Sequence, residues 1–290
     1  MIIDLQLHST YSDGFFTPTQ LAKFIAKRGI EIASLTDHHT VSGQKEFRIA
    51  CREQGLKAVT GVEIYARLNQ KTFNLLWYNF DDNGAGLHDL LRKTQIRRRC
   101  RVRQILESLQ RDGFKLEVEK ILDKYTHYVP VNKVAGDFYA HPYNHQRVQR
   151  ELKTRNVREE DILNHYFFNP KYGVLSETHI DINKILELRK KIGGKLIFCH
   201  PGKHNKYAGG LSQKLKKIGV DGIEVLSPHH SIRAVMYSQY LAKELDWIAT
   251  GGSDFHLLEG KNLLLQHSGQ WFSIESKYLR KINEILKYAI

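Results

Sequence analysis

Short apolar segments recur along the chain and predict seven strands. The first, residues 2–7, alternates apolar and polar side chains, and the others are short apolar runs with the lengths typical of buried strands. The predicted strands are Ile2–Leu7, Ile32–Thr36, Leu56–Thr60, Phe73–Tyr78, Lys195–Cys199, Gly222–Leu226 and Trp247–Thr250.

Helical segments separate most of these strands. Thr17-Pro18 places an N-cap before a proline at the first helical position, and the helix that follows is expected to stop at Gly29. A second helix opens at Ser42, a third is capped by Asp181, and a final one lies near Ser276–Tyr288. Because strands that alternate with helices pair in parallel, the pattern predicts an α/β fold. Periodicity alone leaves open whether the sheet closes into a barrel.

The middle of the chain follows a different pattern. After the break at Gly84-Ala85-Gly86, residues Leu87–Gln110 predict one long helix, and Glu117–Lys124 and Val157–Phe168 predict shorter ones. No strong strand pattern occurs between about residues 83 and 170. We therefore predict a helical insertion, 83–170, within a domain formed by residues 1–82 and 171–290.

Histidine and acidic side chains follow the predicted strands closely. Ligands of parallel α/β folds bind at the carboxyl ends of the strands, so these side chains are expected to converge. Imidazole and carboxylate together suit Zn, Mn or Fe, and a cluster of this size could hold two or three ions. The residues at or near strand ends are His8, Asp13, Asp37, His38, His39, Glu63, His200, Glu224, His229, His230, Asp254 and His256, and Asn74 lies inside the fourth strand.

Composition narrows the partners. The chain of 290 residues has 44 Lys and Arg against 31 Asp and Glu, a net charge of +13, which favours nucleotides, nucleic acid or other phosphate esters. Three cysteines exclude a disulfide scaffold and suit a reducing compartment. No apolar stretch approaches the roughly 20 residues of a membrane span, and the first residues carry no basic segment typical of a signal peptide. A cytoplasmic location without a membrane partner is expected.

Six motifs surround the strand-end residues. They are DLQLHSTYSDG, LTDHHTVSG, Gly61-Val62-Glu63, FCHPG, GIEVLSPHHS and GGSDFH. Together they closely resemble the PHP (polymerase and histidinol phosphatase) metallo-phosphoesterases, nearest to the nucleotide phosphatase and 5′–3′ exoribonuclease branch. The resemblance covers residues 1–80 and 171–260 well and the insertion loosely. It implies a distorted (β/α)7 barrel holding up to three divalent ions (Mn, Zn, Fe or Mg).

The resemblance also implies a ligand set of seven residues. They are His8, Asp13, His38, Glu63, His200, Asp254 and His256. One ion would use position 6, His8, Glu63 and Asp254; a second would share Glu63 with position 74 and His200; a third would use Asp13, His38 and His256. Metal-bound hydroxide would then attack phosphorus.

The chain departs from the family pattern at several positions. Gln6 and Asn74 stand where the family usually has histidine, and His39 stands where it usually has aspartate. Amide oxygens are neutral and weaker ligands, better suited to Mg²⁺ or Ca²⁺, so Gln6 and Asn74 are weak ligands or inert remnants. We therefore expect reduced or altered metal occupancy. An Arg-Pro-His triplet usual in the insertion is absent around Val131-Asn132-Lys133.

Fewer residues are candidates for contact with substrate phosphate than for metal binding. His230 resembles a family position near the substrate, Lys203 (with His204 and Lys206) follows a strand end, and Lys133 could replace the missing arginine. A surface role is an alternative for His230 and the expectation for His229, and His39 is expected beside the ligands or at the surface. The run Arg97–Arg103 wraps around its helix, so a solvated face is expected, although a path for an RNA backbone stays open.

Two functional hypotheses remain. The first is a metal-dependent phosphoesterase that hydrolyses phosphate esters of nucleotides or short 5′-phosphorylated RNA or DNA. The second is a degenerate, non-catalytic PHP domain that binds a nucleotide or nucleic acid, motivated by Gln6, Asn74 and the missing triplet.

Overall fold

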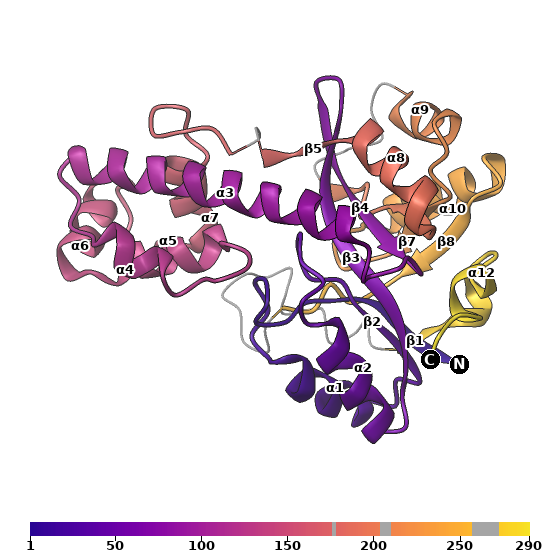
Figure 1. Ribbon diagram of the computed structural model, residues 1–290. Helices are drawn as coiled ribbons and strands as arrows, with labels where there is room; N and C mark the ends of the chain where they lie inside the picture. Colours follow the sequence, from indigo (N-terminus) through magenta and orange to yellow (C-terminus); the bar gives the residue numbers. More distant parts are fainter. Residues whose placement is uncertain (176–177, 204–209, 257–272) are drawn as a thin grey trace.

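A computed structural model describes residues 1–175, 178–203, 210–256 and 273–290, and places a strand-rich barrel beside a helical lobe (Figure 1). His204 and Lys206, named above with Lys203 as candidates for contact with substrate phosphate, lie outside the described residues. The strands are β1 (Ile2–Leu7), β2 (Ile32–Leu35), β3 (Lys57–Leu68), β4 (Lys71–Tyr78), β5 (Ile180–Asp181), β6 (Lys195–Phe198), β7 (Gly222–Leu226), β8 (Ile248–Gly251) and β9 (Ile274–Glu275).

Seven of these strands form a nearly closed barrel, as predicted. Their order is β8-β7-β6-β4-β3-β2-β1, and the two-residue strands β9 and β5 pair with β1 and β3. The two ends of the sheet meet where Leu7 and Phe255 form an isolated parallel bridge, and the His8 amide donates to the Phe255 carbonyl at 3.1 Å. The fold class inferred from the sequence is therefore confirmed.

The prediction of an all-parallel sheet is wrong at β4. This strand pairs antiparallel with both β3 and β6. Strand β3 extends well beyond Thr60, and only Asn69 and Gln70 separate it from β4. Asn69 has φ +55°, a left-handed conformation that asparagine tolerates in tight turns. The direct turn replaces a helical crossover and reverses the strand direction.

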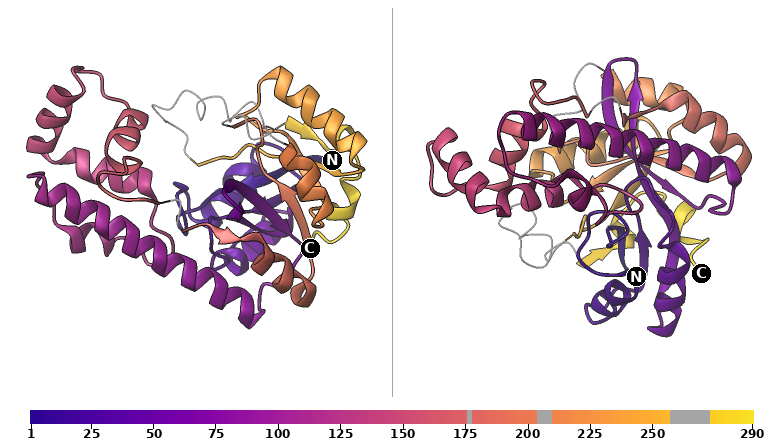
Figure 2. Two further views of the ribbon diagram at one scale, coloured as in Figure 1. Left: turned by 90° about the horizontal axis from the view of Figure 1, so that it is seen from above. Right: turned by 60° about the vertical axis from the view of Figure 1, so that its left-hand side comes forward.

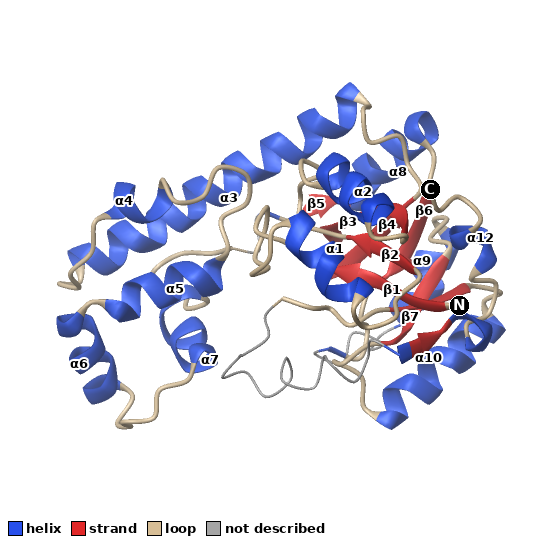
Figure 3. Ribbon diagram, turned by 90° about the horizontal axis from the view of Figure 1, so that it is seen from below, coloured by secondary structure: helices blue, strands red, loops and turns tan. Residues whose placement is uncertain are grey.

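Helices pack around the outside of the barrel (Figure 3), and those whose positions were predicted begin close to them. The α1 N-cap, Thr17, accepts a hydrogen bond from the Gln20 amide at 3.2 Å, and the Gln20 side chain bonds back to Thr17 in a capping box. The covering helices are α1 (Pro18–Ala26), α2 (Gln44–Glu53), α8 (Ile182–Ile192), α9 (Leu211–Lys217) and α10 (Ile232–Glu244).

The helical lobe has a hydrophobic core of its own, built around residues such as Leu106, Phe138 and Phe167. It lies to one side of the barrel, with the long helix α3 joining the two (Figures 1 and 2). The boundaries at residues 82 and 171 stay a prediction. The lobe comprises α3 (Ala85–Arg111), α4 (Val118–Leu122), α5 (Val131–Ala140), α6 (Pro142–Glu151), α7 (Glu159–Ile162) and the π-helix η1 (Leu163–Phe167).

Three local expectations need correction. Helices α5 and α6 are absent from the prediction; α6 begins with Pro142 at its first position, a favoured place for proline, and Pro130 is the N-cap residue of α5. The helix expected over Val157–Phe168 is α7 continued as η1. The final helix is shorter than expected, with a 3₁₀ turn η6 (Ser276–Tyr278) followed by α12 (Asn283–Leu286). No helix in the described ranges combines the length and apolarity needed to cross a membrane.

Candidate metal centre at the barrel mouth

The strand-end histidines and carboxylates converge at one end of the barrel around His8, the residue that follows β1. The His8 Nε2 atom lies 3.2 Å from Glu63 Oε2 and 3.1 Å from Asp254 Oδ1. Glu63 comes from the middle of β3 and Asp254 from the loop after β8. These three buried side chains form one group with ligand atoms close enough to hold an ion.

A second group lies on the other side of the His8 ring. Asp13 Oδ1 lies 3.2 Å from His256 Nε2, and Asp13 Oδ2 lies 3.4 Å from His38 Nε2. His8 Nδ1 joins this group at 3.6 Å from Asp13 Oδ1. The His8 and His256 rings are stacked with centroids 4.1 Å apart. Four residues from three separate loops and strand ends can therefore offer ligands to one ion.

A third group uses the other oxygen of Glu63. Oε1 lies 3.3 Å from His200 Nε2, and Cys199 completes the group. Two side-chain amides donate to this carboxylate, Asn74 Nδ2 to Oε1 at 2.6 Å and Gln6 Nε2 to Oε2 at 3.1 Å. Asn74 reaches the site because β4 runs in reverse, which brings the first half of that strand to the barrel mouth.

Charge in the cluster is balanced between acids and imidazoles. Burial favours the neutral form of Glu63, but the charges of His38 and His200 and the close approach of the His8 and His200 rings hold its pKa well below the usual range. Burial likewise acts against protonation of His8, yet contacts with Asp254 and Glu63 raise its pKa well above the usual value. Positive charge on imidazoles thus compensates the buried carboxylates here, a role that a divalent cation would take over.

Several buried polar atoms in the cluster have no hydrogen-bond partner within the described part of the chain. Both ring nitrogens of His8, Asp254 Oδ1 and Gln6 Oε1 are among them. His8 Nε2 lies close to two carboxylates without the alignment of a hydrogen bond, which is how ligands around a common ion are arranged. Unpaired buried polar groups are costly unless something binds them. This donor set fits divalent cations.

Hydrogen bonds to two buried aspartates fix the loops that carry the ligands. Asp37 accepts from the Ser9 amide at 2.7 Å and from the Ser9 hydroxyl at 2.6 Å, which holds the loop leading to Asp13. Asp4 accepts from the Ser253 amide at 2.9 Å, beside Asp254. Burial raises the pKa of Asp4 to about 7.

Three residues of the site adopt left-handed backbone conformations that side chains with a Cβ rarely occupy. They are His39 (φ +52°), His200 (φ +24°) and Asp254 (φ +48°). Each lies within a few residues of the end of a strand, β2, β6 or β8, where the chain turns away from the sheet. Strained conformations of this kind cluster at functional sites.

The expectation that His229 lies at the surface is wrong. Its side chain is 6% exposed, and Nε2 lies 2.6 Å from Asp254 Oδ2, so it holds that carboxylate in place. Burial and the nearby Lys203 charge lower the pKa of His229 to about 4. His39 is also buried and accepts a hydrogen bond from the Tyr65 amide at 3.2 Å. Neither position carries a sequence signal beyond its place after a strand.

Three residues were predicted to contact substrate phosphate. Two of them, His230 and Lys133, form hydrogen bonds within the protein, and Lys203 lines a cavity. His230 bonds to the backbone through both ring nitrogens, Nδ1 to the Val225 carbonyl at 2.8 Å and Nε2 to the Gly202 amide at 3.1 Å, so its ring is engaged within the protein. Lys133 donates to the Gly14 carbonyl at 2.7 Å, next to Asp13. Lys203 lines a cavity of about 570 Å³ at the barrel mouth.

That cavity contains a cation missed by the sequence reading. Arg98 of α3 was expected on a solvated face, but it is buried, with Nε donating to the Val129 carbonyl at 2.8 Å. Its guanidinium lies 4.3 Å from the centre of the Tyr128 ring. Asn74, Cys199 and His200 line the same cavity, together with acidic residues of α7.

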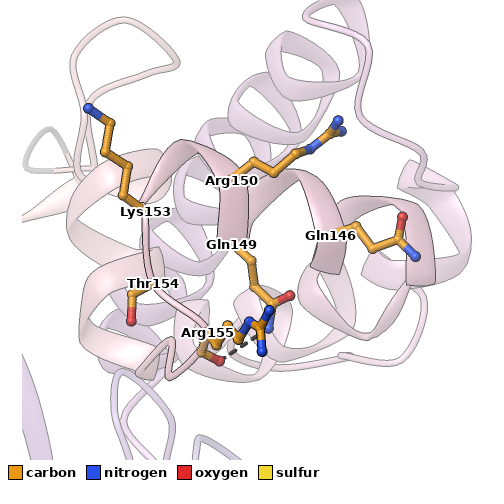
Figure 4. Close-up of a pocket in the computed structure, with 6 residues that line it drawn as sticks. All are labelled: Gln146, Gln149, Arg150, Lys153, Thr154 and Arg155. Carbon is orange, nitrogen blue, oxygen red and sulfur yellow. Dashed lines mark hydrogen bonds between the residues drawn. The ribbon is translucent and has the colours of Figure 1, made fainter.

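Another cavity, of about 470 Å³, lies in the helical lobe at the end of α6 (Figure 4). Its lining is polar and basic, and a Gln149 side chain donates to the Arg155 carbonyl across it at 3.1 Å. It contains no histidine or carboxylate. The chemistry needed for metal binding is therefore at the barrel mouth and not here.

The fold and the cluster define an α/β barrel of the metal-dependent hydrolase type. Residues 4–167 match the model of the PHP domain, and the chain belongs to this family. The comparisons confirm the predicted class, a PHP-type phosphoesterase.

Curated relatives match over most of their length. A 5′–3′ exoribonuclease of Haemophilus influenzae is 28% identical over 91% of this chain and 95% of its own. A phosphoribosyl 1,2-cyclic phosphate 1,2-diphosphodiesterase of Eggerthella lenta is 26% identical over 88% and 94%. A 3′,5′-nucleoside bisphosphate phosphatase of Chromobacterium violaceum is 24% identical over 88% and 87%.

Solved structures share the fold. One from Bifidobacterium adolescentis, described as a metal-dependent phosphoesterase, superposes with a TM-score of 0.78 at 20% identity and covers 99% of this chain and 96% of its own. An amidohydrolase from Chromobacterium violaceum gives a TM-score of 0.70 at 23% identity over 88% of each chain.

Proposed function

We propose that this chain hydrolyses phosphate esters of nucleotides or of short 5′-phosphorylated oligonucleotides, with up to three divalent ions at the barrel mouth. The observation that carries the proposal is the convergence of seven strand-end ligands into three overlapping groups beside a cavity that contains Arg98 and Lys203. The substrates of the curated relatives, an RNA, a cyclic phosphate and a nucleoside bisphosphate, are all phosphate esters.

The ligand roles follow from the geometry of the three groups. We assign Asp13, His38 and His256 with His8 to one ion, and His8, Glu63 and Asp254 to the next. Ions held there would polarise a phosphoryl oxygen and lower the pKa of water. Glu63, with each oxygen directed to a different group, is the bridging ligand of the proposal.

The cationic residues of the cavity have distinct roles in this proposal. Arg98 binds the substrate phosphate, because its planar guanidinium is already held by Val129 and Tyr128 and offers further N–H donors. Lys203 adds positive charge at the same cavity. Lys133 acts indirectly, by holding the Asp13 loop through Gly14. The carboxylates of Glu159 and Glu160 also line this cavity and repel negative charge, so they disfavour ligands that carry several negative charges.

A non-catalytic binding module is the second candidate. It is favoured by the two amides, Gln6 and Asn74, because both donate to Glu63 and satisfy this carboxylate without an ion. A protein that holds fewer ions could retain the cavity and bind a nucleotide without hydrolysis.

One experiment separates the two candidates. Purified protein is assayed for phosphate release from a panel of nucleotides and 5′-phosphorylated dinucleotides with Mn²⁺, Mg²⁺ or Zn²⁺, and its metal content is measured. Two or three equivalents of metal with turnover support the enzyme. Folded protein without turnover in any metal refutes hydrolysis, and one equivalent or none then favours the binding module.

A matched pair of variants tests whether metal binding and turnover depend on the metal centre at the barrel mouth. Glu63→Gln should reduce both metal content and turnover, whereas Glu53→Gln, the same change on the exposed end of α2, should alter neither. Equal effects of the two substitutions would refute the assignment of Glu63 as a metal ligand.

We also propose a cytoplasmic location. The support is that Cys51, Cys100 and Cys199 are all free thiols, as expected in a reducing compartment.

A further inference from the structure

The third ligand group contains one imidazole, one carboxylate and one thiol, those of His200, Glu63 and Cys199. Asn74 lies beside the same carboxylate, but a carboxamide binds borderline metal ions more weakly than an imidazole does. Cys199 immediately precedes His200, and its backbone amide donates to the Asn74 carbonyl at 3.0 Å. The thiol is therefore the soft ligand that this group offers besides the His200 imidazole.

The distances in this group match those around one ion. Zinc binds sulfur at about 2.3 Å and nitrogen or oxygen at about 2.0–2.2 Å, so ligand atoms at the corners of a tetrahedron lie about 3.3–3.8 Å apart. His200 Nε2 is 3.3 Å from Glu63 Oε1, and Cys199 Sγ is 3.7 Å from the same oxygen. Both values fall in that range.

The surroundings of the thiol also indicate a bound group. Cys199 is 1% exposed, yet it lines the cavity at the barrel mouth together with Asn74 and His200, so an ion can reach it. Gln6 is fully buried; its Nε2 lies 3.3 Å from Cys199 Sγ, and its Oε1 has no hydrogen-bond partner among the described residues. A buried amide oxygen left unpaired on the side chain that contacts the thiol is an independent sign that something binds near them.

We propose that Cys199 is a metal ligand of the third group and binds the ion as a thiolate. The ion is bound by Cys199, His200 and Glu63, and the Asn74 amide can supply an oxygen by turning about its terminal bond. The thiol proton passes to solvent when the ion binds. A sulfur ligand selects Zn²⁺, Fe²⁺ or Co²⁺ over Mg²⁺ at this position. This inference rests on the proposed metal centre, and its test does not depend on hydrolysis.

The test is spectroscopic and uses Co²⁺ as the probe. Metal-free full-length protein is titrated with Co²⁺ without oxygen, and the near-ultraviolet and visible absorption is recorded. A thiolate bound to Co²⁺ gives an intense charge-transfer band in the near ultraviolet, which nitrogen and oxygen ligands do not. We expect this band in the unaltered protein and in the controls Cys51→Ala and Cys100→Ser, and its loss in Cys199→Ser.

A competition assay gives a second readout. With a chromophoric chelator, Cys199→Ser should weaken the affinity for Zn²⁺ by more than about tenfold, since even groups that only orient a ligand change metal affinity by 10–100-fold. Affinity for Mg²⁺ should change little. Cys199→Ala, checked for folding by circular dichroism, repeats both measurements if the serine variant does not fold.

The possible outcomes are distinct. Visible Co²⁺ absorption without a charge-transfer band in the unaltered protein overturns the role of Cys199 and leaves the metal centre standing. A band that persists in Cys199→Ser also overturns it. No Co²⁺ binding at all overturns both this inference and the proposed centre.

Discussion

Replacement of Arg98 by methionine tests how the cavity recognises its ligand. Methionine keeps an unbranched chain of similar length but removes the charge and every donor. A hydrogen bond from a charged group contributes about 1.5–3 kcal/mol, so the loss of contact with a substrate phosphate should lower kcat/KM by about 10- to 150-fold. The effect should appear for every phosphorylated substrate, because the contact is to phosphate and not to a base.

The same substitution also has a structural cost, which must be measured separately. It removes the Nε donor at 2.8 Å from the Val129 carbonyl and the guanidinium above Tyr128. A buried carbonyl left unpaired costs about 1–3 kcal/mol and a cation–π contact about 1 kcal/mol, so the free energy of unfolding should fall by about 2–4 kcal/mol. Denaturant unfolding of the metal-free protein measures this directly.

The matched control is Arg97→Met, the same change one residue earlier on the exposed side of α3. Steady-state rates on a 5′-phosphorylated dinucleotide are measured for both variants under conditions where both are folded, and inhibition by inorganic phosphate gives a readout independent of turnover. Arg97→Met should stay within about 0.5 kcal/mol of the unaltered protein in stability. If the two variants lose kcat/KM and phosphate affinity equally, Arg98 does not bind phosphate.

Further predictions concern metal removal, pH and thiol reactivity. Removal of ions with a chelator should lower the melting temperature, because ions that bind the folded state stabilise that state. Addition of Mn²⁺ or Zn²⁺ should restore the melting temperature. A melting temperature that chelation leaves unchanged would argue against a metal centre. The pKa of Asp4 is raised from 3.8 to about 7, so the folded state holds this proton more tightly than the unfolded chain does, and the free energy of unfolding should fall by up to about 4 kcal/mol as pH rises from about 4 to 7. Asp4→Asn should flatten the pH dependence of unfolding over that range. A profile parallel to that of the unaltered protein would refute the role of Asp4. A maleimide should label exposed Cys100 rapidly and buried Cys51 only after unfolding, because burial raises the pKa of the Cys51 thiol to about 12. Mass spectrometry of the labelled native protein checks this order. Early modification of Cys51 would contradict the prediction.

Residues directly after parallel strands were the most predictable part of the site. His8, His38 and His200 follow β1, β2 and β6, and strand direction alone brings such positions to one end of a barrel. Glu63 was expected just after a strand and lies inside the longer β3, yet it reaches the same place because that strand passes the mouth.

Other features depended on packing that one sequence does not specify. Arg98 belongs to a helix whose arginines surround its axis, so the buried side was decided only by how the helical lobe packs against Tyr128 and Val129. The direction of β4 depended on a two-residue turn at Asn69, in a segment between two predicted strands to which no element was assigned. His229 required the path of the loop after β7, which brings it back onto Asp254.

The left-handed conformations of His39, His200 and Asp254 limit how this protein can be made more heat-resistant. Each such residue costs about 1–3 kcal/mol, a large share of the 5–15 kcal/mol that holds a typical domain together. Glycine at any of these positions would relax the backbone and also delete the imidazole or carboxylate that the turn presents. Selection for thermal tolerance alone would therefore erode the barrel mouth first, and stabilising changes compatible with catalysis have to be sought elsewhere in the barrel or in the helical lobe.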